Sequence, residues 1–519
     1  MRKVLLYICS VFILGGMTSC EDFLDKREDV GLTEDDIFRD YYSLRGFLDQ
    51  SFNQLENVMV MDNWENGRAF VGLFADEMAT TDNSSAVFTL HSGNWLSNAK
   101  SSTTFEIGNG GSTAISRSYK ALRINNRIIN DIDKAPLTPE QKNEILGQAY
   151  FYRSWFYFQI IKRYGGMPII DKVFEGGDDD IPRMTYHESH DWMMEDIQKA
   201  IYMLPDSWDD PNYGRPTKIA AMALKEWAQL FDASPLMQND LNSTENKGYD
   251  TERAKSAAKS AYEVIRYMDG SKSAPYPYGL ASKEEYTNIF YFKYPPVHQP
   301  EYIWVKRQFP NADNQNQKRT IRTFWQYEDL AFGSGPDGNS MCCPSLNIVN
   351  MFDKKGADGI YYPIDDPRSG YALDYDHKPF EDRDPRFYNN ILLPGTTWGH
   401  YADGRTYYIT TYKGGAAYQH MLTQKDCNKR MFTGFMCKKF MWPECNQYLE
   451  KNNPNCWWDY RFLTIYIRAS QIYLDYAEAL FEGCGSATAT IEGCPISAAE
   501  AINILRRRIG LTDLPSDIV

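Results

Sequence analysis

Tryptophans placed among short polar side chains are the residues of this sequence that most directly suggest binding chemistry. Sugars present flat C–H faces bordered by hydroxyl groups, so a sugar site combines an exposed aromatic ring with carboxylate, amide or guanidinium groups. Trp95 is the strongest candidate, because the small and polar residues His91-Ser92-Gly93-Asn94 before it leave its ring accessible. The candidate binding residues are Trp64, Asp82, Asn83, Asn94, Trp95, Trp325 and Trp398.

The aromatic content of the chain fits a second interpretation equally well. Aromatic residues make up 14% of the sequence, including 12 Trp and 36 Tyr, and the same composition suits a large aromatic core. Each loop tryptophan therefore has the alternative of being buried beneath its loop. Trp155, Trp192 and Trp227 differ from the loop residues, because they recur at helical spacing with other apolar side chains, and we expect them in the core.

Motifs for catalysis and for metal binding are weak in this sequence. It contains no G-x-S-x-G, no P-loop and no dinucleotide-binding glycine pattern. His187-Glu188-Ser189-His190 lacks the H-E-x-x-H spacing of a zinc protease, so we expect a solvated helix face there. Paired carboxylates for glycoside hydrolysis remain an open alternative, because the distance between them is a structural quantity. Asp178-Asp179-Asp180 could hold calcium, although an acidic loop without metal is the favoured interpretation, and no other cofactor is expected.

The cysteines suggest disulfide bonds more than a metal site. The chain has ten cysteines and no C-x-x-C pair, which disfavours zinc. In an exported protein such cysteines are disulfide candidates, and Cys484 and Cys494 are the strongest pair because they flank one Gly- and Thr-rich turn.

The N-terminus has the pattern of an export signal. Arg2 and Lys3 precede an apolar run, residues 4–16, that is too short to span a membrane stably. Met17-Thr18-Ser19-Cys20 resembles the cleavage motif of bacterial lipoproteins, which predicts a lipid on Cys20. Glu21 and Asp22 resemble the acidic export tag of surface lipoproteins in Bacteroidetes. The net charge of −14 disfavours nucleic acid and anionic lipid as partners.

Helical periodicity dominates both ends of the chain. Residues 145–164 carry apolar side chains around much of the helix circumference, and Gly165, Gly166 and Pro168 end that helix. Neighbouring segments place alanines where two helices would cross, in the manner of a degenerate tetratricopeptide repeat. We therefore expect a mostly α fold with a scaffold of helical hairpins. The expected helices span residues 34–58, 112–133, 145–164, 187–204, 217–233, 251–268, 470–481 and 497–508.

The domain organisation follows from where this periodicity stops. Residues 270–465 are rich in Pro, Gly, Asn, Tyr and Trp, and a segment this long is not structureless inside a compact domain. We expect an aromatic-rich insertion with short strands at residues 302–307 and 407–412. The predicted division is a signal peptide at 1–20, a tether at 21–32, a helical scaffold at 33–269 and 466–519, and the insertion at 270–465.

These pieces, taken in order, resemble the SusD/RagB family of outer-membrane lipoproteins from Bacteroidetes. The family pattern continues past the position of Val519, so the closing of the last helix pair is the part of the resemblance left open. The matching segments are Cys20-Glu21-Asp22-Phe23-Leu24-Asp25, residues 149–170 with Arg163-Tyr164-Gly165-Gly166-Met167-Pro168, Asp196-Ile197, Leu204-Pro205, Gly214-Arg215-Pro216-Thr217, Asp384-Pro385-Arg386-Phe387, Arg468-Ala469-Ser470, Tyr476-Ala477-Glu478-Ala479 and residues 502–511.

The resemblance implies a binding protein without catalytic residues. Members of the family capture nutrient, mostly glycan, at the extracellular face of the outer membrane, where a lipid anchors them. They act as a lid on a SusC-like TonB-dependent transporter, and their ligand contacts come from loops after the first helix and within the insertion. A peptide-capturing member of the same family is the first alternative, and a glycosidase with a Trp-lined cleft is the second.

Overall fold

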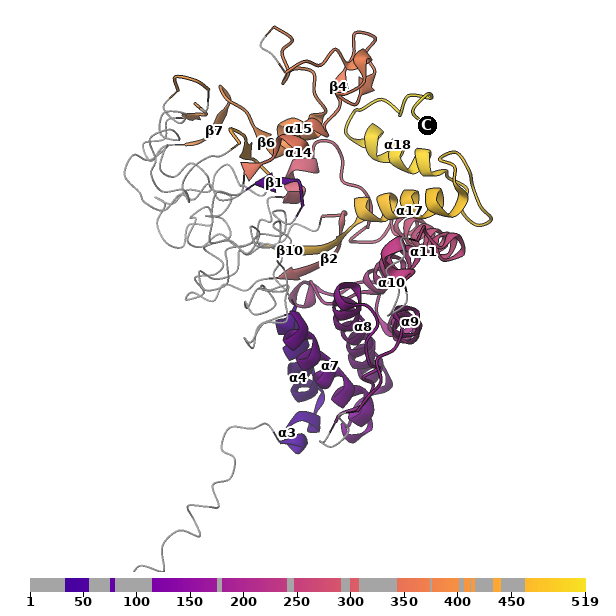
Figure 1. The fold of residues 1–519 in the computed structure, drawn as a ribbon. Helices are drawn as coiled ribbons and strands as arrows, with labels where there is room; N and C mark the ends of the chain where they lie inside the picture. Colours follow the sequence, from indigo (N-terminus) through magenta and orange to yellow (C-terminus); the bar gives the residue numbers. More distant parts are fainter. Residues whose placement is uncertain are drawn as a thin grey trace, which may run out of the picture.

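The computed structural model of the chain consists of helices that lie side by side in chain order and form a curved scaffold (Figure 1). The long helices are α4 (Tyr41–Gln54), α7 (Ala114–Asp131), α8 (Pro139–Tyr164), α9 (Tyr186–Met203), α10 (Lys218–Ala233), α11 (Thr251–Gly270), α17 (Ala469–Cys484) and α18 (Ala498–Arg508). The short α3 (Glu34–Phe38) precedes them. The structure describes residues 33–55, 75–79, 114–174, 180–239, 247–290, 299–307, 343–373, 376–400, 406–410, 412–415, 433–439 and 463–519.

Each long helix packs against the next one along the chain, which confirms the predicted tetratricopeptide-like scaffold of helical hairpins. The same pairing continues across the gap between α11 and α17, which pack closely although the segment between them is long. We call this segment the insertion. Among the described helices, none has the length and the apolar character that a membrane-spanning segment requires.

The sequence around α8 explains both ends of this helix. Thr138 forms a capping box with Gln141, and Pro139 occupies the first helical position, where its missing N–H costs nothing. Gly165 ends the helix with a φ of +77°, a conformation that suits glycine. A Cβ on Gly166 would lie 2.1 Å from the carbonyl oxygen of Met184, so only glycine fits there.

One expected helix boundary is wrong. The periodicity predicts a single helix over residues 34–58, whereas the structure has α3 and α4 with a break between them. Asp40 causes the break, because its extended backbone and its side chain, which accepts from the Ser43 backbone N–H at 2.8 Å, start a new helix.

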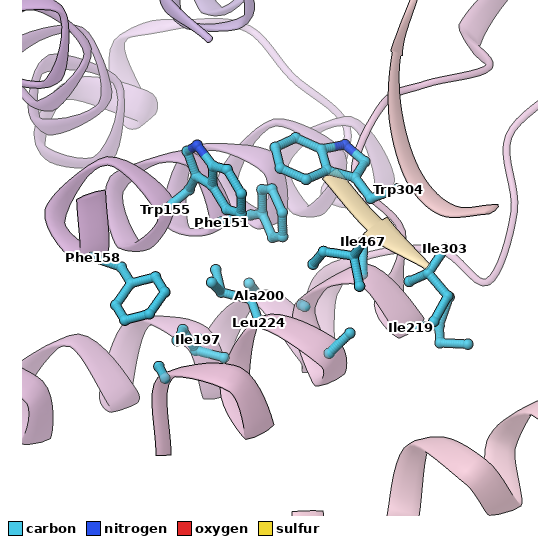
Figure 2. Close-up of a cluster of buried hydrophobic side chains, with 14 of the residues drawn as sticks. Phe151, Trp155, Phe158, Ile197, Ala200, Ile219, Leu224, Ile303, Trp304 and Ile467 are labelled. Carbon is cyan, nitrogen blue, oxygen red and sulfur yellow. The ribbon is translucent and has the colours of Figure 1, made fainter. Parts of the chain in front are cut away.

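Aromatic side chains of α8 form the centre of the scaffold core (Figure 2). Trp304 enters this cluster from a strand of the insertion, and its ring centroid lies 4.8 Å from that of Phe151 and 4.7 Å from that of Trp155, edge to face. Trp155 is buried, and Trp192 and Trp227 pack against the same cluster, which confirms the prediction that these three tryptophans belong to the core.

Small residues allow the helices to approach each other closely. Gly483 of α17 faces α11, where a Cβ would lie 2.9 Å from the Lys255 side chain and 3.1 Å from its backbone nitrogen. Alanines on the facing helices are fully or almost fully buried, as the sequence pattern predicts. They are Ala220, Ala221, Ala223 and Ala228 of α10, Ala254, Ala257, Ala258 and Ala261 of α11, and Ala479 of α17.

The insertion leaves and rejoins the scaffold through one antiparallel strand pair, β2 (Tyr302–Arg307) and β10 (Leu463–Arg468). The strand predicted at residues 302–307 is therefore confirmed, whereas the strand predicted at 407–412 is shorter than expected. The remaining pairs are β1 (Met78–Ala79) with β3 (Cys343–Pro344), β4 (Lys354–Lys355) with β5 (Tyr361–Tyr362), β6 (Ile391–Leu392) with β9 (Met436–Cys437), and β7 (Thr397–His400) with β8 (Thr406–Tyr408).

Short helices complete the described structure. In the described part of the insertion, short α-helices lie near the strands (Figure 1). They are α14 (Leu346–Asn350) and α15 (Pro385–Asn390). The 3-10 turns are η2 (Ile132–Lys134), η3 (Asp210–Asn212), η4 (Pro235–Met237), η5 (Tyr286–Phe290) and η6 (Pro367–Ser369).

A buried carboxylate joins the start of the insertion to the end of strand β10 and to helix α18. Glu301, which is fully buried, lies 2.7 Å from the Arg508 guanidinium of α18 and 3.3 Å from that of Arg468. Arg506 of α18 adds an ion pair with Asp353 of the insertion at 2.8 Å. These contacts fix the base of the insertion against the C-terminal end of the scaffold.

Candidate functional site

Most of the residues that the sequence proposed as ligand contacts lie outside the described residues. Trp398 lies in strand β7, but its side chain is not described. The lipidation candidate and the first two aspartates of the possible calcium loop also lie outside the described residues. The predicted residues outside the description are Trp64, Asp82, Asn83, Asn94, Trp95, Trp325, Cys20, Asp178 and Asp179. Their proposed roles remain predictions.

The described part of the chain has two adjacent cavities between α4, the start of α8 and the 205–217 loop, which connects α9 to α10. We call this region the α4–α8 groove. Its first cavity has a volume of about 420 Å³ and the second about 490 Å³. Arg45 and Asn212 line both cavities, so the two cavities adjoin at these residues.

Hydrogen bonds hold the 205–217 loop in place. The indole N–H of Trp208 donates to the carbonyl of Pro216 at 2.8 Å, within the loop. The core residue Trp304 donates its own indole N–H to the carbonyl of Gly214 at 3.2 Å, which fixes the loop to the scaffold. Gly214 itself has a φ of +99°, which a residue with a Cβ rarely adopts. The loop therefore presents its side chains in one arrangement.

The first cavity combines an aromatic ring with hydrogen-bonding groups. Trp208 is half-buried, and its ring is fixed by the bond to the Pro216 carbonyl. The carboxylates and amides that line the cavity with it are Glu140, Asn143, Glu144, Asp209 and Asn212. These groups accept and donate hydrogen bonds around an aromatic face, which is the arrangement that a sugar ring requires.

Tyr41 links the first cavity to the junction of the groove. Its hydroxyl donates a short hydrogen bond to Glu144 of α8 and accepts one from the Arg45 guanidinium at 3.3 Å. Burial, and then the bond to the Glu144 carboxylate, raise the pKa of Tyr41 to about 12. Tyr41 is therefore a neutral hydrogen-bonding group at physiological pH.

The second cavity contains a tightly bound ion pair. Arg215 donates to both carboxylate oxygens of Asp49, at 2.7 and 2.9 Å, and also to Gln148 at 3.0 Å. Burial opposes the charge on Arg215, but the hydrogen bond and the charge of Asp49 outweigh it and raise the pKa of Arg215. Phe52 and Tyr213 provide apolar wall next to this pair.

Sequence reasoning missed the groove, although one part of it could have been found. Trp208 stands between acidic and small residues in Asp206-Ser207-Trp208-Asp209-Asp210, which is the same criterion that selected Trp95. Arg45 had no such pattern, because it lies on an ordinary amphipathic helix and becomes part of a site only when the 205–217 loop packs against α4.

The predicted disulfide between Cys484 and Cys494 is not formed, because both residues are free thiols in the structure. Cys484 is the last residue of α17, whereas Cys494 is buried in a β-bridge with Ile491 and interacts with the Tyr476 hydroxyl. The backbone of the turn and this contact with Tyr476 occupy Cys494, and the turn closes without a covalent link.

The prediction of a solvated helix face at His187 and His190 is also wrong. His190 is buried, and His187 is half-buried with its Nδ1 2.7 Å from the Asp232 carboxylate. Arg253 of α11 binds the same carboxylate. The four side chains connect α9, α10 and α11, which is a structural role. Among the described residues, no group of three or more His, Cys, Asp or Glu has an arrangement that could hold a metal ion.

A pair of carboxyl groups occurs in the scaffold, but outside the groove. Glu226 of α10 interacts with Asp475 of α17, and burial raises the pKa of Asp475 to about 7. Neither residue lines the two cavities of the α4–α8 groove. This carboxyl pair therefore takes no part in the groove.

The fold and the groove define a class of protein: a helical-hairpin scaffold with a loop-rich insertion and a polar, aromatic binding groove. The chain belongs to the SusD/RagB family. Residues 22–226 match the family model described as "Starch-binding associating with outer membrane", and residues 300–518 match the SusD family model. Proteins of this family are binding proteins associated with the outer membrane, and nutrient, in particular carbohydrate, is what they bind.

Solved structures of similar fold support this assignment. A SusD-like protein from Bacteroides fragilis is 21% identical with a TM-score of 0.67, and the alignment covers 93% of this chain and 82% of that one. A SusD-like carbohydrate-binding protein from the same strain is 18% identical, with a TM-score of 0.62 and coverage of 92% and 80%. A laminarin-binding SusD-like protein is 17% identical, with a TM-score of 0.53 and coverage of 92% and 86%. No curated protein sequence matches the chain.

Proposed function

We propose that this protein captures oligo- or polysaccharide at the cell surface and delivers it to a SusC-like TonB-dependent transporter, over which it acts as an extracellular lid. The observation that carries the proposal is the first cavity of the groove, where a fixed indole ring is surrounded by carboxylates and amides. The protein belongs to a family whose members bind carbohydrate, and its structural neighbours include a carbohydrate-binding and a laminarin-binding protein.

Capture of this kind requires no covalent chemistry. A sugar ring would stack on Trp208, and its hydroxyl groups would donate to Glu144 and Asp209. Because Trp208 is already fixed by its bond to the Pro216 carbonyl, little side-chain entropy is lost on binding. The loop tryptophans predicted from the sequence, with Trp95 first among them, would add further stacking surfaces along a longer glycan.

The proposal includes a cellular location, which is inferred from the N-terminal sequence. A lipid on Cys20 would hold the protein at the extracellular face of the outer membrane, and residues 21–32 would form the tether between the lipid and α3. The acidic residues Glu21 and Asp22 directly after the anchor support export to the surface.

The proposed partnership with the transporter is tested by purifying an affinity-tagged form of this protein from the outer membrane. We expect the transporter to be purified together with it. Recovery of the tagged protein without the transporter would contradict the partnership.

The binding proposal is tested with soluble protein that begins at Glu21. A glycan panel measured by calorimetry should identify a ligand that the protein retains without releasing reducing ends. Replacing Trp208 with alanine should lower the affinity for that ligand about tenfold, because the stacking face is lost. Replacing Tyr202, which is 86% exposed on α9, is the matched control and should leave the affinity unchanged.

The outcomes separate the alternatives. Absence of any retained glycan, with peptide recovered from the purified protein, would establish the peptide-capturing alternative. Release of reducing ends over time would establish a glycosidase. Unchanged affinity after Trp208→Ala, with a loss after Trp95→Ala, would move the binding site from the groove to the loops.

A further inference from the structure

The two cavities of the α4–α8 groove differ in charge. The first has three carboxylates in its lining, namely Glu140, Glu144 and Asp209, against the single cation Arg45. The second has two cations, Arg45 and Arg215, against one carboxylate, Asp49. Arg45 lies at the junction between the two cavities, and Asp49 is the only carboxylate in the lining of the second.

The two arginines of the second cavity are bound in different ways. Arg215 forms the bidentate pair with Asp49, which satisfies both charges and uses the only carboxylate in that lining. Arg45 is held by neutral groups instead: one Nη donates to the Tyr41 hydroxyl and the other to the Asn212 side-chain oxygen. Within the described residues, Arg45 forms no ion pair with a carboxylate; the carboxylates of Glu144 and Asp209 are each one hydrogen bond further on, through Tyr41 and Asn212 respectively.

Arg45 therefore has the properties of an anion-binding group prepared in advance. The residue is half-buried, the direction of its guanidinium is fixed by two hydrogen bonds, and its charge is not neutralised by an ion pair in the described structure. A structural arginine in this position would be expected to pair with a carboxylate, as Arg215 does three residues beyond the shared Asn212. The protein as a whole carries a net charge of −14, so general attraction does not bring anions to this face.

We propose that the second cavity of the α4–α8 groove is a subsite for an anionic substituent of the glycan, a uronate carboxylate or a sulfate, bound by Arg45. The proposal rests on the proposed function and specifies its substrate class. The uncharged, hydroxyl-rich sugar ring occupies the first cavity, where the carboxylates accept hydrogen bonds from its hydroxyl groups. The charged substituent extends past Asn212 into the second cavity and binds the guanidinium, between the apolar walls of Phe52 and Tyr213.

Arg45→Gln and Arg45→Lys separate charge from shape. Glutamine retains a side chain that can hydrogen-bond Tyr41 and Asn212 but removes the charge, whereas lysine retains the charge without the planar fork. Arg39→Gln is the matched control, because it removes a cation of the same type whose side chain is 66% exposed and pairs with Asp36 and Asp40, outside the groove. Thermal unfolding of all variants verifies that each is folded.

The probes are oligosaccharides of equal length, two anionic and two neutral: tetragalacturonic acid and a sulfated chondroitin tetrasaccharide against cellotetraose and maltotetraose. We expect the parent protein to bind an anionic probe about tenfold more tightly than any neutral probe, and Arg45→Gln to remove this preference while Arg45→Lys keeps part of it. The affinity of the parent protein for the anionic probe should fall with added salt more steeply than that of Arg45→Gln.

Two results would overturn the subsite, and they differ from a failure of the proposed function. Equal affinity of the parent protein for neutral and anionic probes, or an anionic preference that survives in Arg45→Gln, overturns the subsite and leaves glycan capture standing. Absence of binding to all four probes and to the wider glycan panel overturns both.

Discussion

The helical scaffold and the insertion bury positive charge in two different ways. In the scaffold, Arg153 of α8 is 5% exposed and forms a bidentate ion pair with Asp196 of α9, with N–O distances of 2.5 and 2.9 Å. In the insertion, Arg383 is 1% exposed and donates instead to backbone carbonyls, those of Val349 and Phe352 at 2.6 and 2.7 Å.

The difference follows from what each kind of structure does with its backbone. An α-helix uses its own carbonyl groups, so a buried cation between helices needs a side-chain carboxylate. The end of a short helix and an irregular chain both leave carbonyl groups without a regular partner, and each must be satisfied when it is buried. Arg383 satisfies those of Val349, Phe352 and Pro379 together, next to a small apolar cluster around Phe387. In the insertion, a single guanidinium thus supplies the hydrogen bonds that regular secondary structure would otherwise give to these carbonyl groups. Burial lowers the pKa of the Arg383 guanidinium.

The largest effect is expected from breaking the scaffold pair on one side. Asp196→Asn leaves the Arg153 charge buried without a counter-charge, and we expect a loss of about 3–5 kcal/mol in the free energy of unfolding. Urea denaturation measures it. The double variant Arg153→Met/Asp196→Leu should recover most of the loss, because it removes both charges. A double variant as unstable as the single one would contradict this account of the scaffold.

Arg383→Met should have the next largest effect, and no second substitution should rescue it. The change leaves the carbonyls of Val349, Phe352 and Pro379 without their donor, at a cost of about 2–4 kcal/mol. Limited proteolysis within the insertion, compared with cleavage of the scaffold, measures where the loss falls. Lys355→Met is the control, because Lys355 is an exposed cation of the same segment. Equal proteolysis of both variants would remove the distinction between the two regions.

The smallest effect concerns a pair of buried carboxyl groups in the scaffold, Glu226 and Asp475. Burial, and then the neighbouring Asp475, raise the pKa of Glu226 well above its ordinary value, while burial raises that of Asp475 to about 7, with Glu478 adding to the shift. The folded protein therefore keeps protons that the unfolded chain releases near pH 4. Stability from this pair is complete below about pH 4 and is lost as the pH rises to about 7.

Glu226→Gln tests this pH dependence. The amide removes the raised pKa of Glu226 itself, so one of the two protons that the folded protein keeps is gone, and the fall in stability between pH 5 and pH 8 should become smaller by about 1–2 kcal/mol. Thermal unfolding at several pH values, compared between the parent protein and the variant, measures the difference. Parallel pH profiles would show that the pair does not share its protons as described.

The sequence predicted the scaffold well because helical periodicity is a local property. Residues 145–164 could be assigned as a helix from their apolar pattern, and Gly165 ends that helix for the reason expected. The break at Asp40 was missed because a capping side chain in the middle of an amphipathic pattern is only a weak local sign. His190 was misplaced because its burial depends on Asp232, which lies on the next helix.

The groove could be predicted only in part, because its residues meet through packing of distant segments. Trp208 had a recognisable setting in its loop, whereas Arg45 acquires its place only from the contact of α4 with Asn212. The free thiols of Cys484 and Cys494 show the same limit, since proximity along the chain did not lead to a bond. The loop tryptophans stay predictions, with Trp95 the one to substitute first.

The contact between α11 and α17 has a consequence for how this protein matures. The face of α11 that receives α17 includes Lys255, which Gly483 approaches, and Tyr262, whose ring centroid lies 5.8 Å from that of Tyr476, and it has no cover until the C-terminal segment is present. This face of α11 stays uncovered until the whole insertion has been synthesised, because α17 follows the insertion in the chain. The scaffold therefore closes only when its last two helices are present.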